Sequence, residues 1–104
     1  MIKEINNVII DVAGPYYKFS NPYGTFVTCR RDEWFVSRVA TDKEKNESKI
    51  IEMLGTKSLG RIVRSRRNKR RYVIDQLYPT QTFSSLNKAL IFLVENDGKL
   101  VFCT

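Results

Sequence analysis

The chain has 104 residues, of which 42% are hydrophobic and 28% are charged, a composition typical of one folded domain over residues 1–104. This balance excludes the weakly hydrophobic, highly charged class of disordered chains. The 18 Lys and Arg residues outnumber the 11 Asp and Glu residues, which gives a formal net charge of +7.

The first 40 residues predict four antiparallel strands. β-Branched residues fill the first run, and Ala13-Gly14-Pro15 after it is typical of a turn. The segment Ser20–Gly24 carries residues that favour turns, so the strands on either side of it are expected to form a hairpin. The polar segment Arg30–Glu33 predicts one more turn. The predicted strands are Lys3–Val12, Tyr16–Ser20, Thr25–Cys29 and Trp34–Val39.

A helix is predicted to begin at Thr41. Thr41 and Glu44 have the spacing of a capping box, in which each side chain binds the backbone amide of the other residue. The helix is expected to end at Gly55, because glycine readily adopts the left-handed conformation that closes helices. Its second half is apolar and is expected to be buried. The residues expected to pack are Ile50, Ile51, Met53 and Leu54.

Three strands and a second helix are predicted in the C-terminal half. Leu59–Ser65 and Tyr72–Tyr78 favour strands, and Asn68 between them is the residue most tolerant of a turn. Ser84 is a suitable cap for a helix in which apolar residues recur at helical spacing. These apolar residues are Leu86, Ala89, Leu90 and Leu93. A last strand is expected over Lys99–Cys103.

The predicted order of elements is therefore ββββ-α-ββ-α-β. The apolar surface of the second helix is broadened by Ile91, Phe92 and Val94, which predicts that this helix covers the sheet. We expect an α+β fold in which an antiparallel sheet of about six or seven strands carries two helices on one face.

The positive charge is concentrated in one segment. Residues 61–71 contain seven basic residues and no acidic one, whereas the other 93 residues contain 11 of each kind. The seven are Arg61, Arg64, Arg66, Arg67, Lys69, Arg70 and Arg71. A block this dense repels itself and is stabilised when a polyanion neutralises it, so it indicates a phosphate-bearing partner. Two other uses stay open, a charged hairpin that blocks edge pairing and a nuclear-localisation signal.

Residues for metal or covalent chemistry are scarce in this chain. It has no His, and its two Cys residues lie 74 positions apart, so we expect no metal site and no cofactor. Cys29 and Cys103 are expected to stay reduced and to fill core positions. Arg30 and Arg31 favour a reactive thiolate at Cys29, but no base is evident beside it.

No segment is apolar over the length that a membrane requires. The longest apolar run, Ala89 to Val94, has six residues, whereas a membrane-spanning helix needs about 20. The opening Met-Ile-Lys-Glu lacks the order of a signal peptide. We therefore expect a cytoplasmic protein without a membrane partner, or a nuclear one if the source is a eukaryote or a eukaryotic virus.

Seven of the twelve aromatic residues lie between residues 16 and 35. Tyr16 and Tyr17 are adjacent, so in a strand they point to opposite faces. The same holds for Trp34 and Phe35. We expect at least one residue of each pair at the surface, where it could stack on a base near Arg30-Arg31 or anchor a protein partner, unless a second layer covers it.

These patterns favour a non-enzymatic nucleic-acid-binding protein whose basic hairpin contacts phosphates. The predicted site comprises the seven basic residues of 61–71 together with Arg30, Arg31 and Tyr72. The sequence is compatible with DNA, whose major groove admits a two-stranded ribbon, and with RNA, which is recognised by shape and unstacked bases.

Two other functions stay open. The first is a small inhibitor or adaptor, of a kind that viruses and mobile elements encode, which docks its basic tip on an acidic surface of a host protein. The second is a ribonuclease without His, in which Tyr72 or Tyr78 acts beside the arginines. RelE-type ribonuclease toxins are similarly small and basic, but chains of that type open with helices, whereas this one opens with strands, and no family motif matches.

Overall fold

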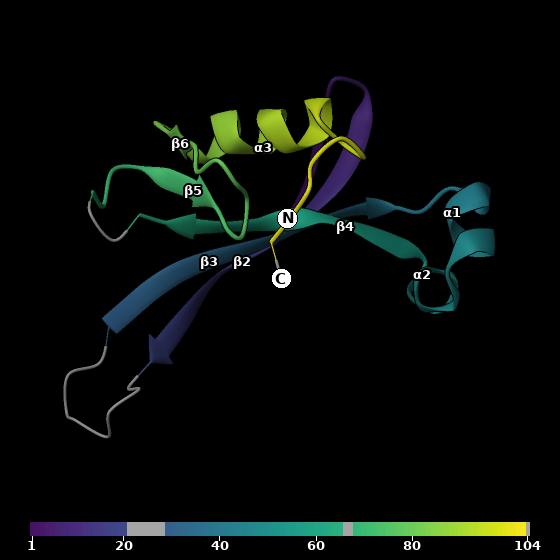
Figure 1. Cartoon of the computed structure of the whole chain (residues 1–104), viewed down its shortest axis with the longest axis horizontal. Coiled ribbons are helices and arrows are strands. Elements are labelled where there is room, and N and C mark those ends of the chain that lie inside the picture. Colours follow the sequence, from purple (N-terminus) through teal and green to yellow (C-terminus); the bar gives the residue numbers. More distant parts are fainter. Residues whose placement is uncertain (21–28, 66–67, 104) are drawn as a thin grey trace.

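The computed structural model of the protein describes residues 1–20, 29–65 and 68–103 (Figure 1). Within these residues the strands are β1 (Ile2–Ile5), β2 (Val8–Ser20), β3 (Cys29–Val39), β4 (Thr56–Arg64), β5 (Tyr72–Ile74) and β6 (Thr82–Phe83). The helices are α1 (Asp42–Glu47), α2 (Lys49–Leu54) and α3 (Leu86–Glu95). The strands form one sheet in chain order, each antiparallel to the next. The predicted antiparallel α+β class is confirmed, but the predicted order is wrong, because the chain runs βββ-αα-βββ-α.

The first predicted strand is in fact a hairpin. Asn6 and Asn7 both have left-handed backbone angles, with φ of 51° and 64°, as a two-residue type I′ turn requires. Ile5 of β1 and Val8 of β2 form the first pair next to this turn, and the two strands pair antiparallel from there. Asn tolerates the left-handed conformation better than other residues with a side chain, so the chain can reverse inside a run that is otherwise β-branched.

The predicted turn after Ala13 is a β-bulge inside β2. Ala13 pairs with Phe35 on β3, and the next pair is Tyr16 with Glu33, so β2 carries one extra residue here. Gly14 has φ of 136°, and a Cβ atom on it would lie 2.6 Å from the carbonyl oxygen of Glu33. Glycine therefore permits the close approach of the two strands, and β2 continues past the bulge.

The turn predicted at Arg30–Glu33 is also wrong, because these residues lie inside β3. β2 has 13 residues and β3 has 11, and together they extend as a two-stranded arm beyond the rest of the sheet (Figure 1). Polar residues are compatible with such an arm, since antiparallel strands can face water. The turn predicted at residues 20–24 and the strand predicted over Thr25–Cys29 lie, except for their end residues, outside the described residues.

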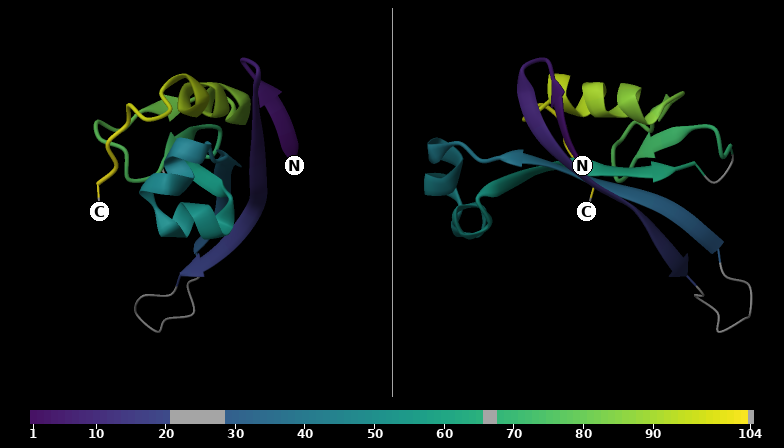
Figure 2. Two further views of the ribbon diagram at one scale, coloured as in Figure 1. Left: turned by 90° about the vertical axis from the view of Figure 1, so that its right-hand side faces the viewer. Right: turned by 180° about the vertical axis from the view of Figure 1, so that it is seen from behind.

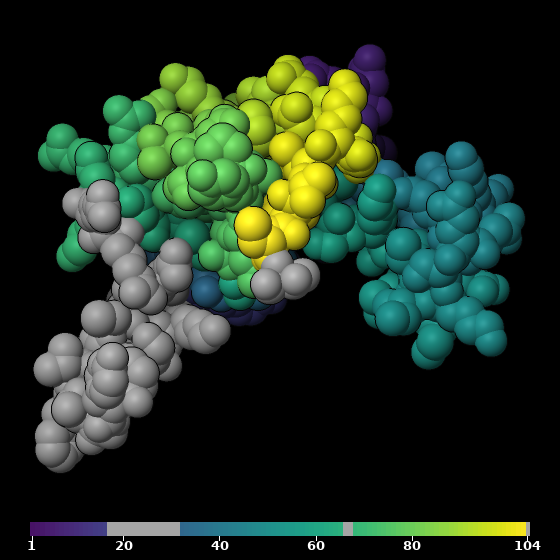
Figure 3. Space-filling view, viewed as in Figure 1, coloured from purple at the N-terminus to yellow at the C-terminus, as the bar shows by residue number. Residues whose placement is uncertain are grey.

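The segment after β3 forms two short helices instead of one packed helix. They meet at Ser48, whose hydroxyl accepts a hydrogen bond from the Ile51 amide, and neither helix buries a residue. Ile50, Met53 and Leu54 are 70%, 86% and 67% exposed. The predicted burial of these residues is therefore wrong. β3 and β4 run past the edge of the core. The two helices between them, residues 42–54, project from the rest of the protein, and we call them the α1–α2 lobe (Figure 3).

Ion pairs connect the α1–α2 lobe to the sheet and to the end of α3. The Arg38 guanidinium donates to both carboxylate oxygens of Glu44, at 2.7 and 2.8 Å, and to Asp97 Oδ2 at 2.6 Å. Lys57 Nζ lies 3.1 Å from Glu44 Oε2. Glu44 also forms the predicted capping box with Thr41, which is confirmed. The Arg38 hydrogen bonds hold the pKa of Glu44 well below its usual range, and they raise the pKa of Arg38.

We expect a Glu44→Gln variant to be less stable than the wild type at neutral pH and to lose this disadvantage in acid. A carboxyl with a lowered pKa in the folded state stabilises the fold above its unfolded-state pKa, which is about 4.3 for Glu. That stabilisation is lost as the pH falls through the folded-state pKa. Thermal unfolding of both proteins between neutral and acidic pH measures the difference, and a constant difference at all pH values would contradict the role of an ionised Glu44.

Helix α3 covers one face of the sheet, as its apolar spacing predicted (Figure 2). Ala89, Leu90 and Leu93 are fully buried in the main core, together with side chains from β1 to β5. The N-cap is Ser85, whose hydroxyl accepts a backbone hydrogen bond of 3.1 Å, one residue later than the predicted Ser84. Among the described helices, only α3 lies over a face of the sheet.

The C-terminal segment does not form the predicted strand over Lys99–Cys103. It makes a single bridge, from Phe102 to Leu77, because β6 already occupies the free edge of β5. The Cys103 amide donates to the carbonyl of Gln76 at 2.7 Å. Cys103 is a free, exposed cysteine, so its predicted core placement is wrong. The corresponding prediction for the side chain of Cys29 lies outside what the structure describes.

Candidate nucleic-acid interface

The antiparallel register gathers the basic segments of the chain at one end of the sheet. β3 pairs with β4 from Glu33 onward, and Glu33 is the Cα partner of Val63 near the end of β4. Arg30 and Arg31 lie in β3, and Lys18 on β2 is the Cα partner of Arg31. Figures 1 and 2 show the β2–β3 arm and the β4–β5 hairpin on the same side of the molecule, opposite the α1–α2 lobe. We call this part of the protein the basic end, and it comprises residues 16–33 and 61–75.

The basic end accounts for the net charge of the whole protein. It contains ten basic and three acidic residues, an excess of seven. The other residues include eight basic and eight acidic ones and are formally neutral. Residues 61–75 supply six of these seven excess charges and residues 16–33 supply one. A bound polyanion would relieve the repulsion within the dense basic segment 61–71.

Hydrogen bonds shape the tip of the β4–β5 hairpin. The Ser65 amide donates to the carbonyl of Arg71, and the Arg71 amide donates to the carbonyl of Asn68, both at 2.9 Å. Asn68 Oδ1 accepts a hydrogen bond from the Arg70 amide at 3.0 Å. The prediction that Asn68 lies in the turn is therefore confirmed.

The side chains at this tip are open to solvent. Lys69, Arg70 and Arg71 are exposed. In the part of the chain that the structure describes, no ion pair uses these three side chains. Among the carboxylates that the structure describes, none therefore offsets their charges. Arg66 and Arg67, also predicted to bind, lie outside the described residues.

Arg61 and Arg64 differ from the tip residues because both are bound to carboxylates. Arg61 Nη2 donates to Asp75 Oδ2, and its Nη1 lies 3.8 Å from Glu33 Oε2. Arg64 Nε donates to Asp32 Oδ2 at 3.1 Å. These acids lie outside residues 61–71 in sequence but beside them in the fold. The absence of acids within the segment therefore does not leave all seven cations unpaired.

Tyr72, another predicted binding residue, supports the base of the same hairpin. The Arg64 guanidinium lies 5.0 Å from the centre of the Tyr72 ring and 5.7 Å from that of Trp34. The two rings are 5.5 Å apart. Trp34 is buried and Tyr72 is partly buried. Packing therefore accounts for the placement of Tyr72, and Arg64 lies over its ring.

Tyr16, Phe35 and Arg61 form a row across β2, β3 and β4. The rings of Tyr16 and Phe35 are 5.8 Å apart, and Arg61 Cζ lies 6.0 Å from the centre of the Phe35 ring. Side chains alternate along β3, so the burial of Trp34 with α3 places Phe35 on the opposite face. Tyr16 is 54% exposed and Phe35 is 44% exposed. Both belong to the adjacent aromatic pairs of which at least one member was predicted to be exposed.

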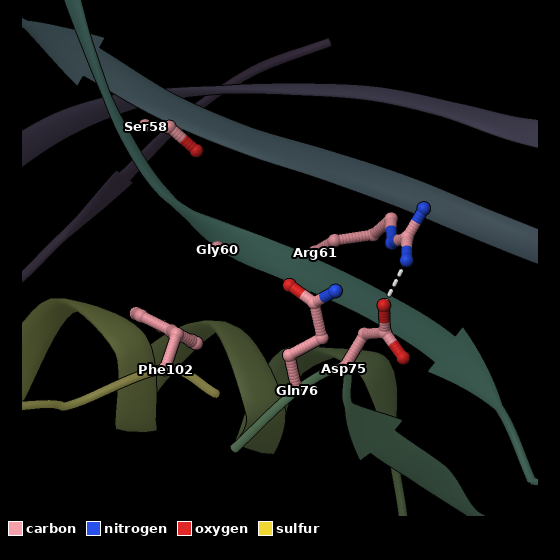
Figure 4. A pocket seen from close by; sticks show the side chains of 6 residues that line it. All are labelled: Ser58, Gly60, Arg61, Asp75, Gln76 and Phe102. Carbon is pink, nitrogen blue, oxygen red and sulfur yellow. Dashed lines mark hydrogen bonds and ion pairs between the residues drawn. The ribbon is translucent and has the colours of Figure 1, made fainter. Parts of the chain in front are cut away.

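A pocket of about 310 Å³ adjoins this row, and Arg61 belongs to both. Its lining residues are Ser58, Gly60, Arg61, Asp75, Gln76 and Phe102 (Figure 4). The pocket forms where β4 continues past the end of β5. Gln76 has a left-handed φ of 62°, which ends the strand earlier than predicted, and its side chain extends toward β4 (Figure 4). Sequence analysis missed this pocket because its walls come from three separate segments.

The described residues offer cations and aromatic rings more than catalytic groups. Among them, no three His, Cys, Asp or Glu side chains are grouped so as to hold a metal ion. No described helix has both the length and the apolar character needed to cross a membrane. Of the two tyrosines considered for catalysis, Tyr72 lies against Arg64 and Tyr78 is 79% exposed.

No protein-family model, curated protein or solved structure matches this chain. Its function is therefore inferred from the geometry and the charge of the basic end.

Proposed function

We propose that this protein is a non-enzymatic nucleic-acid-binding protein that contacts phosphates with its basic end. The observation that carries the proposal is the position of the basic β4–β5 hairpin and of the basic residues of β2 and β3 at one end of the sheet, which holds the entire net charge. Clustered Arg and Lys attract the phosphate backbone of DNA or RNA, and the release of counterions makes their contact favourable. Arg in particular can bind a phosphate through two parallel hydrogen bonds.

The seven basic residues of 61–71 divide into two groups under this proposal. The five at the tip contact phosphates, and Arg30 and Arg31 on the neighbouring strand extend the contact. The tip residues are Arg66, Arg67, Lys69, Arg70 and Arg71. Arg61 and Arg64 supply no phosphate contact, because their carboxylate partners offset their charge, and these ion pairs hold the base of the hairpin in place.

Binding is expected to depend strongly on salt and weakly on sequence. If the five tip residues meet phosphates, the logarithm of the affinity for duplex DNA should fall with the logarithm of salt concentration with a slope of about −4 to −5. Fluorescence anisotropy with labelled duplexes of unrelated sequence measures this slope. A slope near about −1 would show that the tip does not contact phosphates.

A second candidate function is an inhibitor or adaptor that docks its basic tip on an acidic surface of another protein, and the exposed apolar residues of the α1–α2 lobe offer a further protein contact at the other end of the molecule. Large apolar residues gathered at the surface often mark protein interfaces, and Met53 is 86% exposed. The absorbance ratio at 260 and 280 nm of the purified protein, before and after a high-salt wash, separates the two functions. Nucleic acid that leaves with salt supports the first, whereas an acidic protein that copurifies without nucleic acid supports the second.

A further inference from the structure

We propose that unpaired nucleobases bind on the row formed by Tyr16, Phe35 and Arg61, so that the preferred ligand of this protein is single-stranded nucleic acid. This inference rests on the proposed function and names the class of ligand. The row lies on the face of the sheet opposite α3 and continues into the basic end, so a strand held by the phosphate contacts can reach it.

The two aromatic rings are placed as a stacking surface. They come from neighbouring strands, their centres are 5.8 Å apart and their planes are tilted by 57°. This tilt means that the rings do not lie flat on each other, and each is about half exposed to solvent. Exposed aromatic rings beside a basic groove are the usual means by which proteins bind single strands, because every base has a face that can stack.

Arg61 extends this surface without adding much net charge. Its guanidinium lies over Phe35 and is bound by Asp75 and Glu33. Glu33 is buried on the neighbouring strand β3, so one partner of the arginine is held in place by packing. A planar guanidinium stacks on bases as an aromatic ring does. The stacking contacts of the row should therefore be separable from the salt-dependent contacts of the tip.

The adjoining pocket lies at the edge of β4, between Arg61 and the side of the sheet that α3 covers, and provides room for a further base of a strand that passes over this edge. Its wall includes the Phe102 ring, and the Gln76 amide extends into the same space (Figure 4). An amide can both donate and accept hydrogen bonds, as the edges of unpaired bases require. Bases in a duplex are stacked and paired, so neither the row nor the pocket can reach their faces.

The affinity of the full-length protein for short labelled oligonucleotides tests this proposal. Anisotropy should show tighter binding of single-stranded RNA or DNA than of the duplex of the same sequence, and the ratio of RNA to DNA affinity identifies the source of the bases. Phe35→Ala and Tyr16→Ala should each lower single-strand affinity by about 5- to 100-fold. Neither should change the salt slope, because no phosphate contact is lost.

Two matched variants serve as controls for the loss of single-strand affinity in the alanine variants. Phe35→Tyr keeps a ring at the same position and should retain most of the affinity. Tyr78→Ala removes an exposed ring that lies outside the row and should change the affinity by less than about twofold. Tyr78 is 79% exposed, more than either ring of the row, so exposure alone does not predict the difference.

Crosslinking keeps the proposal testable if an alanine variant fails to fold. Ultraviolet irradiation of wild-type protein bound to a strand containing 5-bromouracil should attach the strand to the peptides that carry Tyr16 or Phe35. Crosslinks confined to residues 66–71, or alanine variants that bind single strands as the wild type does, would overturn this inference and leave phosphate binding in place. If the wild type binds no nucleic acid at all, the proposed function itself fails.

Discussion

Replacing the five tip residues with serine is expected to remove most of the affinity for nucleic acid, because the phosphate contacts supply nearly all of the non-specific binding. The salt dependence should flatten to the small slope that the contacts of Arg30 and Arg31 supply. The five residues are Arg66, Arg67, Lys69, Arg70 and Arg71. Stability should stay within about 1 kcal/mol of the wild type, since Lys69, Arg70 and Arg71 are exposed and exposed residues contribute little packing. Two acids outside the tip have other partners among the described residues. Asp75 is bound by Arg61, and Glu95 accepts a hydrogen bond from Asn6.

A pair of triple variants separates local charge from net charge. One replaces Lys69, Arg70 and Arg71 at the tip, and the other replaces lysines of the α1–α2 lobe, at the opposite end of the molecule. The lobe variant is Lys43→Ser, Lys45→Ser and Lys49→Ser, and it also removes three positive charges. The tip variant should bind much more weakly, whereas the lobe variant should bind nearly as the wild type does.

Anisotropy and thermal unfolding on the same samples decide between the alternatives. Equal losses of affinity in both triple variants would mean that only the overall charge matters. Unchanged affinity in the five-residue variant would rule out the tip as the phosphate-binding site. Lost affinity together with unfolding would mean that the tip is part of the folded core and not a binding surface.

Leu90→Ala is expected to destabilise the protein by about 2 to 5 kcal/mol. Leu90 lies in the middle of α3, is fully buried and belongs to the main core. Removing its side chain leaves a cavity that the surrounding side chains and the sheet below them can fill only in part.

Leu54→Ala is the matched control for this change. Leu54 is 67% exposed on the α1–α2 lobe, so the same truncation should cost less than about 0.5 kcal/mol. Urea unfolding monitored through the buried Trp34 measures both variants. Equal effects at the two positions would contradict the placement of α3 as the helix that covers the core.

Local sequence patterns, which act over a few residues, determined the burial of α3, one helix cap, one turn and the concentration of charge. The apolar spacing of α3 reports burial on one face because the period of the helix sets which side chains point the same way. The capping box of Thr41 and Glu44 and the turn at Asn68 are local hydrogen-bonded structures, and both are present as predicted. The concentration of positive charge in residues 61–71 is a property of the sequence alone.

The candidate site needed the tertiary structure because its features depend on neighbouring strands. Gly14-Pro15 is typical of a turn, but the approach of β3 makes it a bulge, and the extra residue moves Tyr16 to the face that carries Phe35. Likewise, Arg61 is recognised as paired only when folding brings Asp75 beside it.

The α1–α2 lobe also depends on the tertiary structure, because burial predicted there does not occur. The spacing of Ile50, Met53 and Leu54 is that of a buried helix face, yet the long strands β3 and β4 carry these residues beyond the core. A hydrophobic pattern indicates which residues would stabilise the fold if they were buried. Whether a surface is there to bury them depends on strand length and register, which long-range pairing sets.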